Sequence, residues 1–347
     1  MPGSKRVTIV SIAEKLGLST TTVGFVLRGQ ARKVNLSEET VRRVREAAKE
    51  MGYVPNLLAR GLRRQKTGMI GLLLADLSMN WAESLHQGLT SVLDQENYTL
   101  FIVMHRWHPA RQAEELERLV RHQADAIICT PIAGCQETYQ QYAGLGRPFT
   151  LVGDTLLGLE EVSVVGWDSE RAAEKAVTHL VEQGCKNLAC IGPRDETVMT
   201  LRRYEAFRRV VEQAGAHTRE DWVDSWDTAT WTPAVSDRWV ARTFGDRERP
   251  EGIFAINDGT ALPLMESLDR AGIRVPEDVA LVGMGDLPMA GMPGIGLSTV
   301  REPLFEMGAE AARVTLRALK EESEEGPARV WLRDAELFAR RTTSISR

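Results

Sequence analysis

From Met69 onward the chain alternates short apolar runs with longer amphipathic stretches, and this rhythm narrows the fold more than any other pattern in the sequence. Short apolar runs bounded by turns predict strands buried on both faces, and the stretches between them, such as 81–95 and 111–123, have the helical period. Repeated strand–helix units predict doubly wound parallel sheets, and because the units form two series, we expect two lobes. The predicted strands are Met69–Leu74, Leu100–Val103, Ala126–Ile128 and Phe149–Val152 in the first series, and Val162–Val165, Leu188–Ile191, Gly252–Ala255 and Val279–Val282 in the second.

The first 53 residues have a different pattern, which predicts a compact bundle of three helices. Thr8, Ser19 and Ser37 each precede a stretch of helical period and are suitable N-caps, because their hydroxyls can accept a hydrogen bond from a free N–H group of the first turn. Gly17 supplies the turn between the first two helices. This arrangement is typical of a helix-turn-helix unit, in which the second helix enters the major groove of DNA.

The charge of the chain is unevenly distributed. Residues 1–66 hold 14 Lys and Arg but five Asp and Glu, a net charge of +9, so the other residues carry −14 of the overall −5. A basic segment attached to an acidic body is typical of a nucleic-acid-binding module, with a solvated basic surface as the alternative. The helical pattern favours DNA binding, and Thr20 and Thr21 at the start of the second helix have hydroxyls that can meet base edges.

Residues 53–64 are unusual for a plain linker. Asn56 can cap a short helix in which Ala59 and Leu62 share one face, with arginines around it. So short a helix, weakened further by Gly61, is unstable by itself. We therefore expect it to form on DNA, with Leu62 as an apolar wedge in a minor-groove step; a basic linker with incidental leucines is the alternative.

A set of short motifs extends over nearly the whole chain. They are Val7–Ile9 with Ile12–Ala13, Gly17–Val23, Ser37–Thr40, Gly52–Asn56, Ala59–Leu62, Thr67–Leu72, Ile256–Asp258, Gly272–Ala280 and Ser298–Pro303. Together and in this order they resemble the lactose-repressor (LacI) family of bacterial transcription regulators. The resemblance implies an all-α helix-turn-helix head and an α/β body of the two-lobed, periplasmic-binding-protein-like (type I) fold, with chain crossings near residues 163–165 and 295. The expected divisions are 1–53 for the DNA-binding domain, 54–66 for the hinge and 67–347 for the effector-binding and dimerisation domain, with an N-lobe of 67–163 and 297–325 and a C-lobe of 164–296 and 326–347.

The resemblance also implies that Thr20 and Thr21 face bases and that Ala59 and Leu62 act in the hinge. The chain departs from the family at Gly24 and Phe25, where a Ser and then a polar or basic residue are usual. Phe25 can touch a thymine methyl but cannot hydrogen-bond a base, so the operator sequence does not follow from the resemblance. The expected DNA contacts are Thr8, Ser19, Thr20, Thr21, Thr22, Phe25, Arg28, Asn56, Ala59, Leu62 and Arg63.

Polar side chains in the loops that follow the predicted strands are the expected effector site, since ligands bind at the carboxyl ends of parallel strands. The family's effector-contacting Arg and Asn fall at Arg203 and Asn257. An Arg, an Asn and carboxylates around an aromatic ring suit a sugar or sugar derivative. The carboxylate that the family often has at position 285 is replaced by Gly285, which keeps a nucleobase or another non-sugar metabolite as the alternative. The expected effector contacts are Asp76, Ser78, Trp81, Asp154, Arg203, Asn257 and Asp286.

Some residues have a structural role as their alternative. Capping or turn chemistry would equally explain Asp76, Ser78 and Asp258, and core packing would explain Trp226, Trp231 and Trp239. His105 and His108 lie near Trp107 and are expected in a solvated loop, because two histidines without further ligands are weak evidence for a metal.

Several function classes find no support in the sequence. It has no nucleophile elbow, P-loop or metal-ligand cluster, so we expect neither an enzyme nor a bound cofactor or metal. It has no run of 18 apolar residues and no secretory signal, so we expect no membrane association and a cytoplasmic, nucleoid-associated protein. The four cysteines are expected to be buried and reduced; they are Cys129, Cys135, Cys185 and Cys190.

We therefore expect a repressor that binds a palindromic DNA operator as a homodimer and responds to a small-molecule effector between its lobes. The resemblance implies dimer contacts through the helices that follow the first strands. A further strand is expected to end about ten residues before Arg347, which leaves no room for a C-terminal heptad helix, so we expect dimers and not tetramers. The alternatives are a solute-binding module without DNA function, which leaves the basic segment unexplained, and an enzyme.

Overall fold

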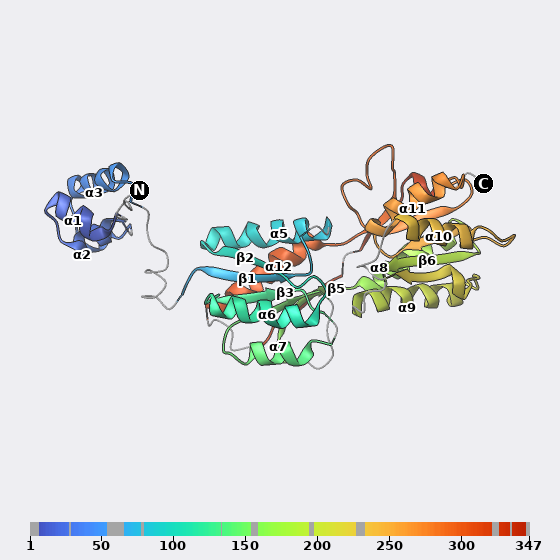
Figure 1. Cartoon of the computed structure of the whole chain (residues 1–347), viewed down its shortest axis with the longest axis horizontal. Coiled ribbons are helices and arrows are strands. Elements are labelled where there is room, and N and C mark those ends of the chain that lie inside the picture. Colours follow the sequence, from blue (N-terminus) through green and yellow to red (C-terminus); the bar gives the residue numbers. More distant parts are fainter. Residues whose placement is uncertain are drawn as a thin grey trace. The chain divides into compact units, whose positions relative to one another are not determined.

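The computed structural model describes residues 7–27, 29–53, 66–77, 80–132, 134–153, 159–193, 198–226, 233–320, 326–333 and 335–344, without the side chains of Asn80, Val198, Ser225, Trp226 and Pro233. The chain forms two compact units, Met1–Thr67 and Gly68–Arg347, here called the head and the body (Figure 1). Seven of the expected site residues lie outside the described residues, namely Arg28, Asn56, Ala59, Leu62, Arg63, Ser78 and Asp154.

The head is a three-helix bundle whose helices begin where the sequence predicts. Thr8 forms a capping box with Ser11, and the hydroxyl of Ser37 accepts a hydrogen bond from the Thr40 N–H at 3.3 Å. Gly17 adopts the left-handed conformation, with φ of 64°, that a turn between two helices requires. Ile12, Val23 and Val44 are fully buried and join the helices in one core. The helices are α1 (Ile9–Leu16), α2 (Thr20–Leu27), the 3₁₀ helix η1 (Ala31–Val34) and α3 (Glu38–Glu50).

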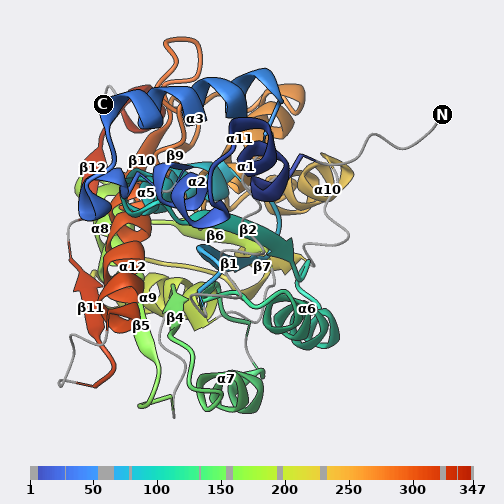
Figure 2. The same cartoon turned by 90° about the vertical axis from the view of Figure 1, so that its left-hand side faces the viewer.

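The first lobe of the body is a six-stranded parallel sheet in the order β11-β5-β4-β3-β1-β2. Helices α5 and α12 lie side by side on one face, and α6 and α7 cover the other (Figure 1, Figure 2). Its strands alternate between these faces, so Leu72 and Leu74 pack under α5 while Leu73 packs under α6. The elements are β1 (Met69–Leu74), α5 (Asn80–Leu93), η2 (Asp94–Glu96), β2 (Thr99–Met104), α6 (Pro109–Arg121), β3 (Ala126–Cys129), α7 (Gln136–Ala143), β4 (Phe149–Val152), β5 (Ser163–Trp167), α12 (Leu304–Leu319) and β11 (Arg329–Leu332).

The second lobe repeats this architecture with a sheet in the order β12-β10-β9-β8-β6-β7, in which β12 is antiparallel to β10. Helices α8 and α9 pack on one face and α10 and α11 on the other (Figure 1). The elements are α8 (Ser169–Glu182), β6 (Leu188–Pro193), α9 (Val198–Gln213), η3 (Glu220–Trp222), β7 (Val223–Trp226), α10 (Pro233–Thr243), β8 (Gly252–Ala255), α11 (Asp258–Arg270), β9 (Ala280–Gly285), β10 (Ser298–Arg301), β12 (Glu336–Phe338) and η4 (Arg341–Thr343).

The strand pairing moves the limits of the lobes from those expected. β5 pairs with β4 and β11, so the first lobe extends to Trp167 instead of residue 163. β10 pairs with β9, so the return crossing follows Arg301 instead of residue 296. β11 belongs to the first sheet and β12 to the second, which places a third crossing between Leu332 and Glu336 instead of at 325. An apolar run indicates a strand, but it does not indicate which sheet the strand joins.

The last described residues are fastened to the second lobe by side-chain hydrogen bonds. Thr342 accepts from the Ser298 N–H at 2.8 Å and donates to the Leu281 carbonyl at 2.7 Å. The Thr343 hydroxyl lies 2.7 Å from that of Ser298 and 2.8 Å from His179 Nε2. β11 thus closes one edge of the first sheet, and the segment after it closes one edge of the second.

The contact between α5 and α12 depends on two glycines that face each other across the helix pair. A Cβ at Gly88 would collide with the carbonyl oxygen of Phe305, and one at Gly308 would collide with that of Leu85. The two backbones can therefore approach more closely than side chains would allow.

Within the described residues no single helix is long and apolar enough to cross a membrane, although α1 and α2, bent by 114° at their junction, together meet the length and composition criteria.

Candidate functional site

The start of α2 presents two hydroxyls to solvent. Thr20 and Thr21 are exposed, and neither side chain bonds to another described residue. The neighbouring hydroxyls are already paired, because Ser19 Oγ lies 2.8 Å from Thr22 Oγ1 and accepts from the Thr22 N–H at 3.0 Å. Thr20 and Thr21 are therefore the residues of this turn whose donors and acceptors remain available to a ligand.

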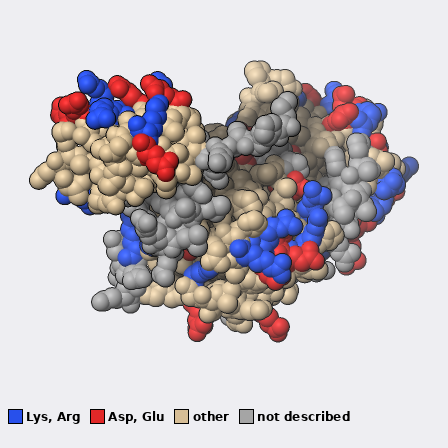
Figure 3. All heavy atoms as spheres, turned by 60° about the vertical axis from the view of Figure 1, so that its left-hand side comes forward, with Lys and Arg blue, Asp and Glu red and all other residues tan. Residues whose placement is uncertain are grey.

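Other expected contacts in the head have local roles in the fold. Thr8 accepts from the Ser11 N–H at 3.2 Å as the cap of α1. Phe25 is half-buried beside Val23 and Val26, which belong to the core. The helix α3 carries four basic and four acidic residues, so the positive excess of the head comes from the flanking segments, including the exposed pair Arg32 and Lys33 on η1. On the face drawn in Figure 3, basic and acidic side chains lie interspersed.

In the body, Arg203 on α9 lies where strands from both lobes end. Its Nη1 donates to the Ile256 carbonyl after β8 at 2.8 Å, and its Nη2 lies 2.5 Å from Glu302 Oε1 after β10. Its guanidinium carbon is 5.8 Å from the ring centroid of Trp167, the last residue of β5. Arg203 and Trp167 are 4% and 3% exposed, so this is a buried ion pair against an aromatic ring. We call Arg203, Glu302, Ile256 and Trp167 the Arg203 cluster.

A second group of polar residues adjoins this cluster. Asn257 caps α11, with its Oδ1 accepting from the Thr260 N–H at 2.8 Å. The buried carboxylate of Asp258 accepts from the Thr299 hydroxyl at 2.7 Å and from the Leu287 N–H at 2.9 Å. The pKa of Asp258 is raised to about 6, mainly by burial and also by the charges of Glu302 and Asp286, while the two hydrogen bonds lower it.

Asp286 follows β9 with φ of 53°, a left-handed conformation that Asp tolerates better than most residues. Its Oδ1 lies 2.6 Å from Arg340 Nη2, so this carboxylate is already paired within the lobe. Of the seven expected effector contacts, the structure therefore brings together Arg203, Asn257 and Asp286 at the strand ends of the second lobe.

Among its described residues, the first lobe contributes less to the candidate effector site than expected. Asp76 is half-buried directly after β1, and Trp81 is half-buried on α5, where it packs against the core. Trp239 is 2% exposed and packs with Phe244 at a centroid separation of 6.4 Å, so it belongs to the core. Trp231 lies outside the described residues.

The expectation of a solvated loop is wrong for His105. This residue is fully buried, and its Nδ1 accepts from the Trp107 N–H at 3.1 Å. Burial lowers the pKa of His105 to about 4, so the imidazole is neutral at pH 7. Its backbone N–H donates to the Leu74 carbonyl at 2.9 Å, which extends the pairing of β2 with β1 and draws the side chain inward.

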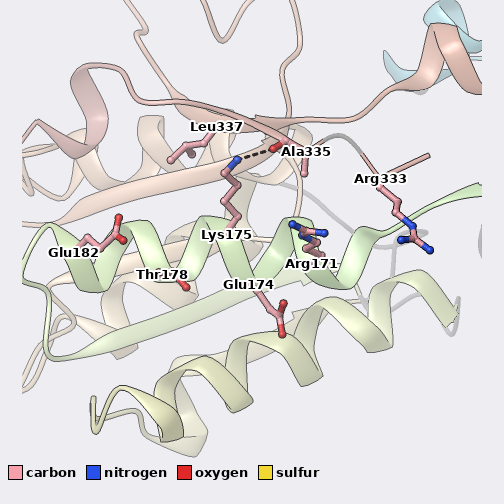
Figure 4. A pocket seen from close by; sticks show the side chains of 8 residues that line it. All are labelled: Arg171, Glu174, Lys175, Thr178, Glu182, Arg333, Ala335 and Leu337. Atoms are coloured by element: carbon pink, nitrogen blue, oxygen red, sulfur yellow. Dashed lines mark hydrogen bonds between the residues drawn. The ribbon is translucent and has the colours of Figure 1, made fainter. Parts of the chain in front are cut away.

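A surface groove of about 560 Å³ lies along α8 and contains none of the expected effector contacts (Figure 4). Lys175 Nζ bridges it by donating to the Ala335 carbonyl at 2.8 Å. The groove is lined by Arg171, Glu174, Lys175, Thr178, Glu182, Arg333, Ala335 and Leu337.

Comparison with known proteins gives matches in both units. Residues 8–56 match the family described as bacterial regulatory proteins, lacI family, and residues 177–343 match the periplasmic binding protein-like domain. The HTH-type transcriptional regulator DegA of Bacillus subtilis (strain 168) is 28% identical over 316 residues, which cover 90% of this chain and 91% of DegA. The chain therefore has a lacI-family DNA-binding domain followed by a periplasmic-binding-protein-like domain, and it is similar to regulators of the lacI family.

Solved structures agree with the fold of both domains. The Lac repressor dimer bound to operator and the anti-inducer ONPF has a TM-score of 0.82 at 20% identity, covering 98% of this chain and 99% of that one. A complex of the transcriptional regulator CelR with cellobiose has a TM-score of 0.69 at 24% identity, covering 97% of this chain and 100% of that one. The helix-turn-helix head and the two-lobed α/β body predicted from the sequence are thereby confirmed.

Two residues of the Arg203 cluster were missed by sequence reasoning. Glu302 stood in a motif that carries the resemblance but had no assigned role, and Trp167 ends a strand that had been placed in the other lobe. Both are strand-end residues, and that position was the signal that could have found them.

Proposed function

We propose that this chain represses transcription by binding a palindromic operator as a homodimer, under the control of a small molecule that binds between the lobes beside Arg203. The observation that carries the DNA-binding part is the pair of exposed threonines, Thr20 and Thr21, at the start of the second helix of a helix-turn-helix head. Hydroxyls at this place can read base edges in the major groove.

The effector part is supported by the Arg203 cluster and by relatives. A buried guanidinium beside Trp167, at the carboxyl ends of strands from both lobes, is a suitable place for a ligand whose binding changes how the lobes close. CelR has been solved with cellobiose, which favours a sugar or sugar derivative for this chain as well. The proposed contacts are Arg203, Asn257, Asp286, Asp76 and Trp81, with Ser78 and Asp154 from the sequence alone.

Operator binding is tested by selecting duplexes from a random DNA library with the full chain and measuring affinity for the winner against random DNA. We expect Thr21→Ala to weaken binding to the selected duplex by roughly 5- to 150-fold, because a good base contact contributes about 1–3 kcal/mol. Binding to random DNA should change little and should fall steeply with salt in both proteins. Thr178→Ala, at an exposed threonine on α8, is the matched control.

Failure to select any duplex at low ionic strength would contradict the proposal. So would an equal loss for Thr21→Ala on selected and random DNA, because phosphate contacts alone would then account for binding.

The hinge is proposed from the sequence alone. Leu62→Ala should weaken binding to the selected duplex while leaving the salt-dependent binding to random DNA largely intact, because an apolar wedge acts only at a deformable base step. Equal loss of both would argue against the wedge.

The homodimer is tested by light scattering on the full chain. A chain of 38.6 kDa should give twice that mass at the concentrations at which it binds the selected duplex. A tetramer, or a monomer that still binds both half-sites, would contradict this part of the proposal.

A further inference from the structure

The guanidinium of Arg203 is only partly used by the protein. A guanidinium has five N–H donors, and two of its nitrogens bond to Ile256 and Glu302. The third, Nε, is buried and has no hydrogen-bond partner among the described residues. A buried donor without a partner is costly, so a ligand that accepts from this N–H would remove that cost.

The charge of Arg203, in contrast, is fully matched. Glu302 neutralises it across 2.5 Å, with both side chains less than a tenth exposed. Glu302 Oε2 accepts no hydrogen bond from a described residue, so this oxygen remains available as an acceptor. The cluster thus offers one unused donor, one unused acceptor and no net positive charge.

The carboxylates around the Arg203–Glu302 ion pair disfavour the binding of an anion. Asp258 is buried, and the charges of Glu302 and of Asp286 each raise its pKa, so both carboxylates act on Asp258. Arg340 compensates Asp286 alone, through its contact at 2.6 Å. An incoming phosphate or carboxylate would add a further negative charge to this group.

We propose that Glu302 is a specificity-determining residue that makes the Arg203 cluster accept uncharged or cationic hydroxyl-bearing ligands and reject phosphorylated or carboxylated ones. This rests on the proposed function, in which the cluster belongs to the effector site.

The physical reason is whether the ion pair between Glu302 and Arg203 is kept or broken when a neutral or an anionic ligand binds. A neutral hydroxyl can accept from Arg203 Nε–H and donate to Glu302 Oε2 while the ion pair stays intact. An anion has to take Arg203 away from Glu302, which leaves a buried carboxylate without its cation beside Asp258. Anionic effectors are therefore excluded by the protein's own carboxylate.

The experiment uses the full chain and two variants. Glu302→Gln removes the charge and keeps the shape, and Glu336→Gln is the matched control, since Glu336 is a carboxylate in an exposed pair with Arg301 at 3.8 Å. The probes are inorganic phosphate, ribose and ribose 5-phosphate, measured by calorimetry and by the shift in melting temperature.

We expect the unchanged chain and Glu336→Gln to show no binding of millimolar phosphate, and Glu302→Gln to gain affinity for phosphate by at least about tenfold. Adding Arg203→Ala to Glu302→Gln should abolish that gain, because Arg203 would hold the anion. In the unchanged chain, ribose 5-phosphate should bind no better than ribose.

The proposal is overturned if Glu302→Gln binds phosphate no better than Glu336→Gln, or if the gain survives the loss of Arg203. It is also overturned, without any variant, if the unchanged chain binds phosphate at millimolar concentration or prefers ribose 5-phosphate over ribose. None of these measurements uses DNA, so failure to select an operator would remove the DNA-binding part of the proposed function and leave the effector part and this result standing.

Discussion

Replacing Asp258 by Asn tests the electrostatics of the second lobe. Its carboxylate is buried, accepts from Thr299 and Leu287, and faces the backbone of Gly283, where a Cβ would collide with Oδ1. An Asn side chain has the same shape and can keep both contacts, with Oδ1 accepting from the Leu287 N–H and Nδ2 donating to the Thr299 hydroxyl. The substitution therefore removes an ionisation while preserving the packing.

The magnitude follows from the pKa of Asp258, which is raised from 3.8 to about 6, first by burial and then by Glu302 and Asp286. Between these two values the folded chain binds a proton that the unfolded chain releases, so stability falls as pH rises through this window. Each pKa unit corresponds to 1.36 kcal/mol, so Asp258 contributes about 3 kcal/mol of stability below pH 4 that is lost by about pH 7.

The assay is urea unfolding of the unchanged chain and of Asp258→Asn at several pH values between 4 and 7.5, at constant ionic strength. We expect the two proteins to have similar stability near pH 4, and the variant to gain on the unchanged chain by about 3 kcal/mol as the pH rises to 7. Asp237→Asn is the control. The bond to Arg270 lowers the pKa of Asp237, so its contribution is lost only below pH 3.8, and the stability difference between Asp237→Asn and the unchanged chain should stay constant across the assayed range.

The reasoning fails if the stability difference between Asp258→Asn and the unchanged chain is constant across this range. It also fails if the unchanged chain gains on the variant as pH rises, because the ionised carboxylate would then be the form that the fold stabilises.

Three further predictions concern packing, capping and thiol chemistry. Gly308→Ala should lower the stability by about 1–3 kcal/mol in thermal unfolding, because the added methyl collides with α5. The control Gly144→Ala, at the exposed end of α7, should change the stability by less than about 0.5 kcal/mol. Equal effects of the two substitutions would refute the close contact between α5 and α12. Ser37→Ala should cost the head about 1 kcal/mol through loss of the α3 cap, and an unchanged melting curve would contradict this. Burial raises the pKa of Cys129 and of Cys190 well above the usual range, so neither thiol should react with a thiol reagent at pH 8 before urea is added. Rapid labelling of either thiol in the folded chain would count against its burial in the core.

Features that depend on local rules could be predicted from the sequence. The caps Thr8 and Ser37 and the turn at Gly17 require only the residue itself and its helical neighbours, and all three lie where expected. The buried strands also followed from local apolar pattern, from Met69–Leu74 onward.

Features that depend on partners far away in the chain could not be predicted from the sequence. The sheet that Ser163–Trp167 joins is decided by its pairing with two strands, β4 and β11, and β11 lies more than 160 residues later. The β11 and β12 strands are short and partly exposed, so their sequences lack the continuous apolar run of a central strand.

The candidate site shows the same division. Arg203 and Asn257 were named because the resemblance placed them, and the capping role of Asn257 is a local one. The partner of Arg203 is Glu302, 99 residues away, and that of Asp286 is Arg340, 54 residues away. No rule of sequence spacing predicts pairs with such separations, so the ion pairs of the site could be identified only from the three-dimensional structure.

The short segment from Arg329 to Thr343 supplies an edge strand to each lobe in turn. A single cut or premature stop before it would uncover the flank of β5 and of β10 at once, leaving two rows of unpaired backbone groups on one molecule. Truncated chains would then be able to join end to end through both flanks. A late nonsense mutation should therefore produce insoluble protein, in contrast to a soluble regulator with one damaged half.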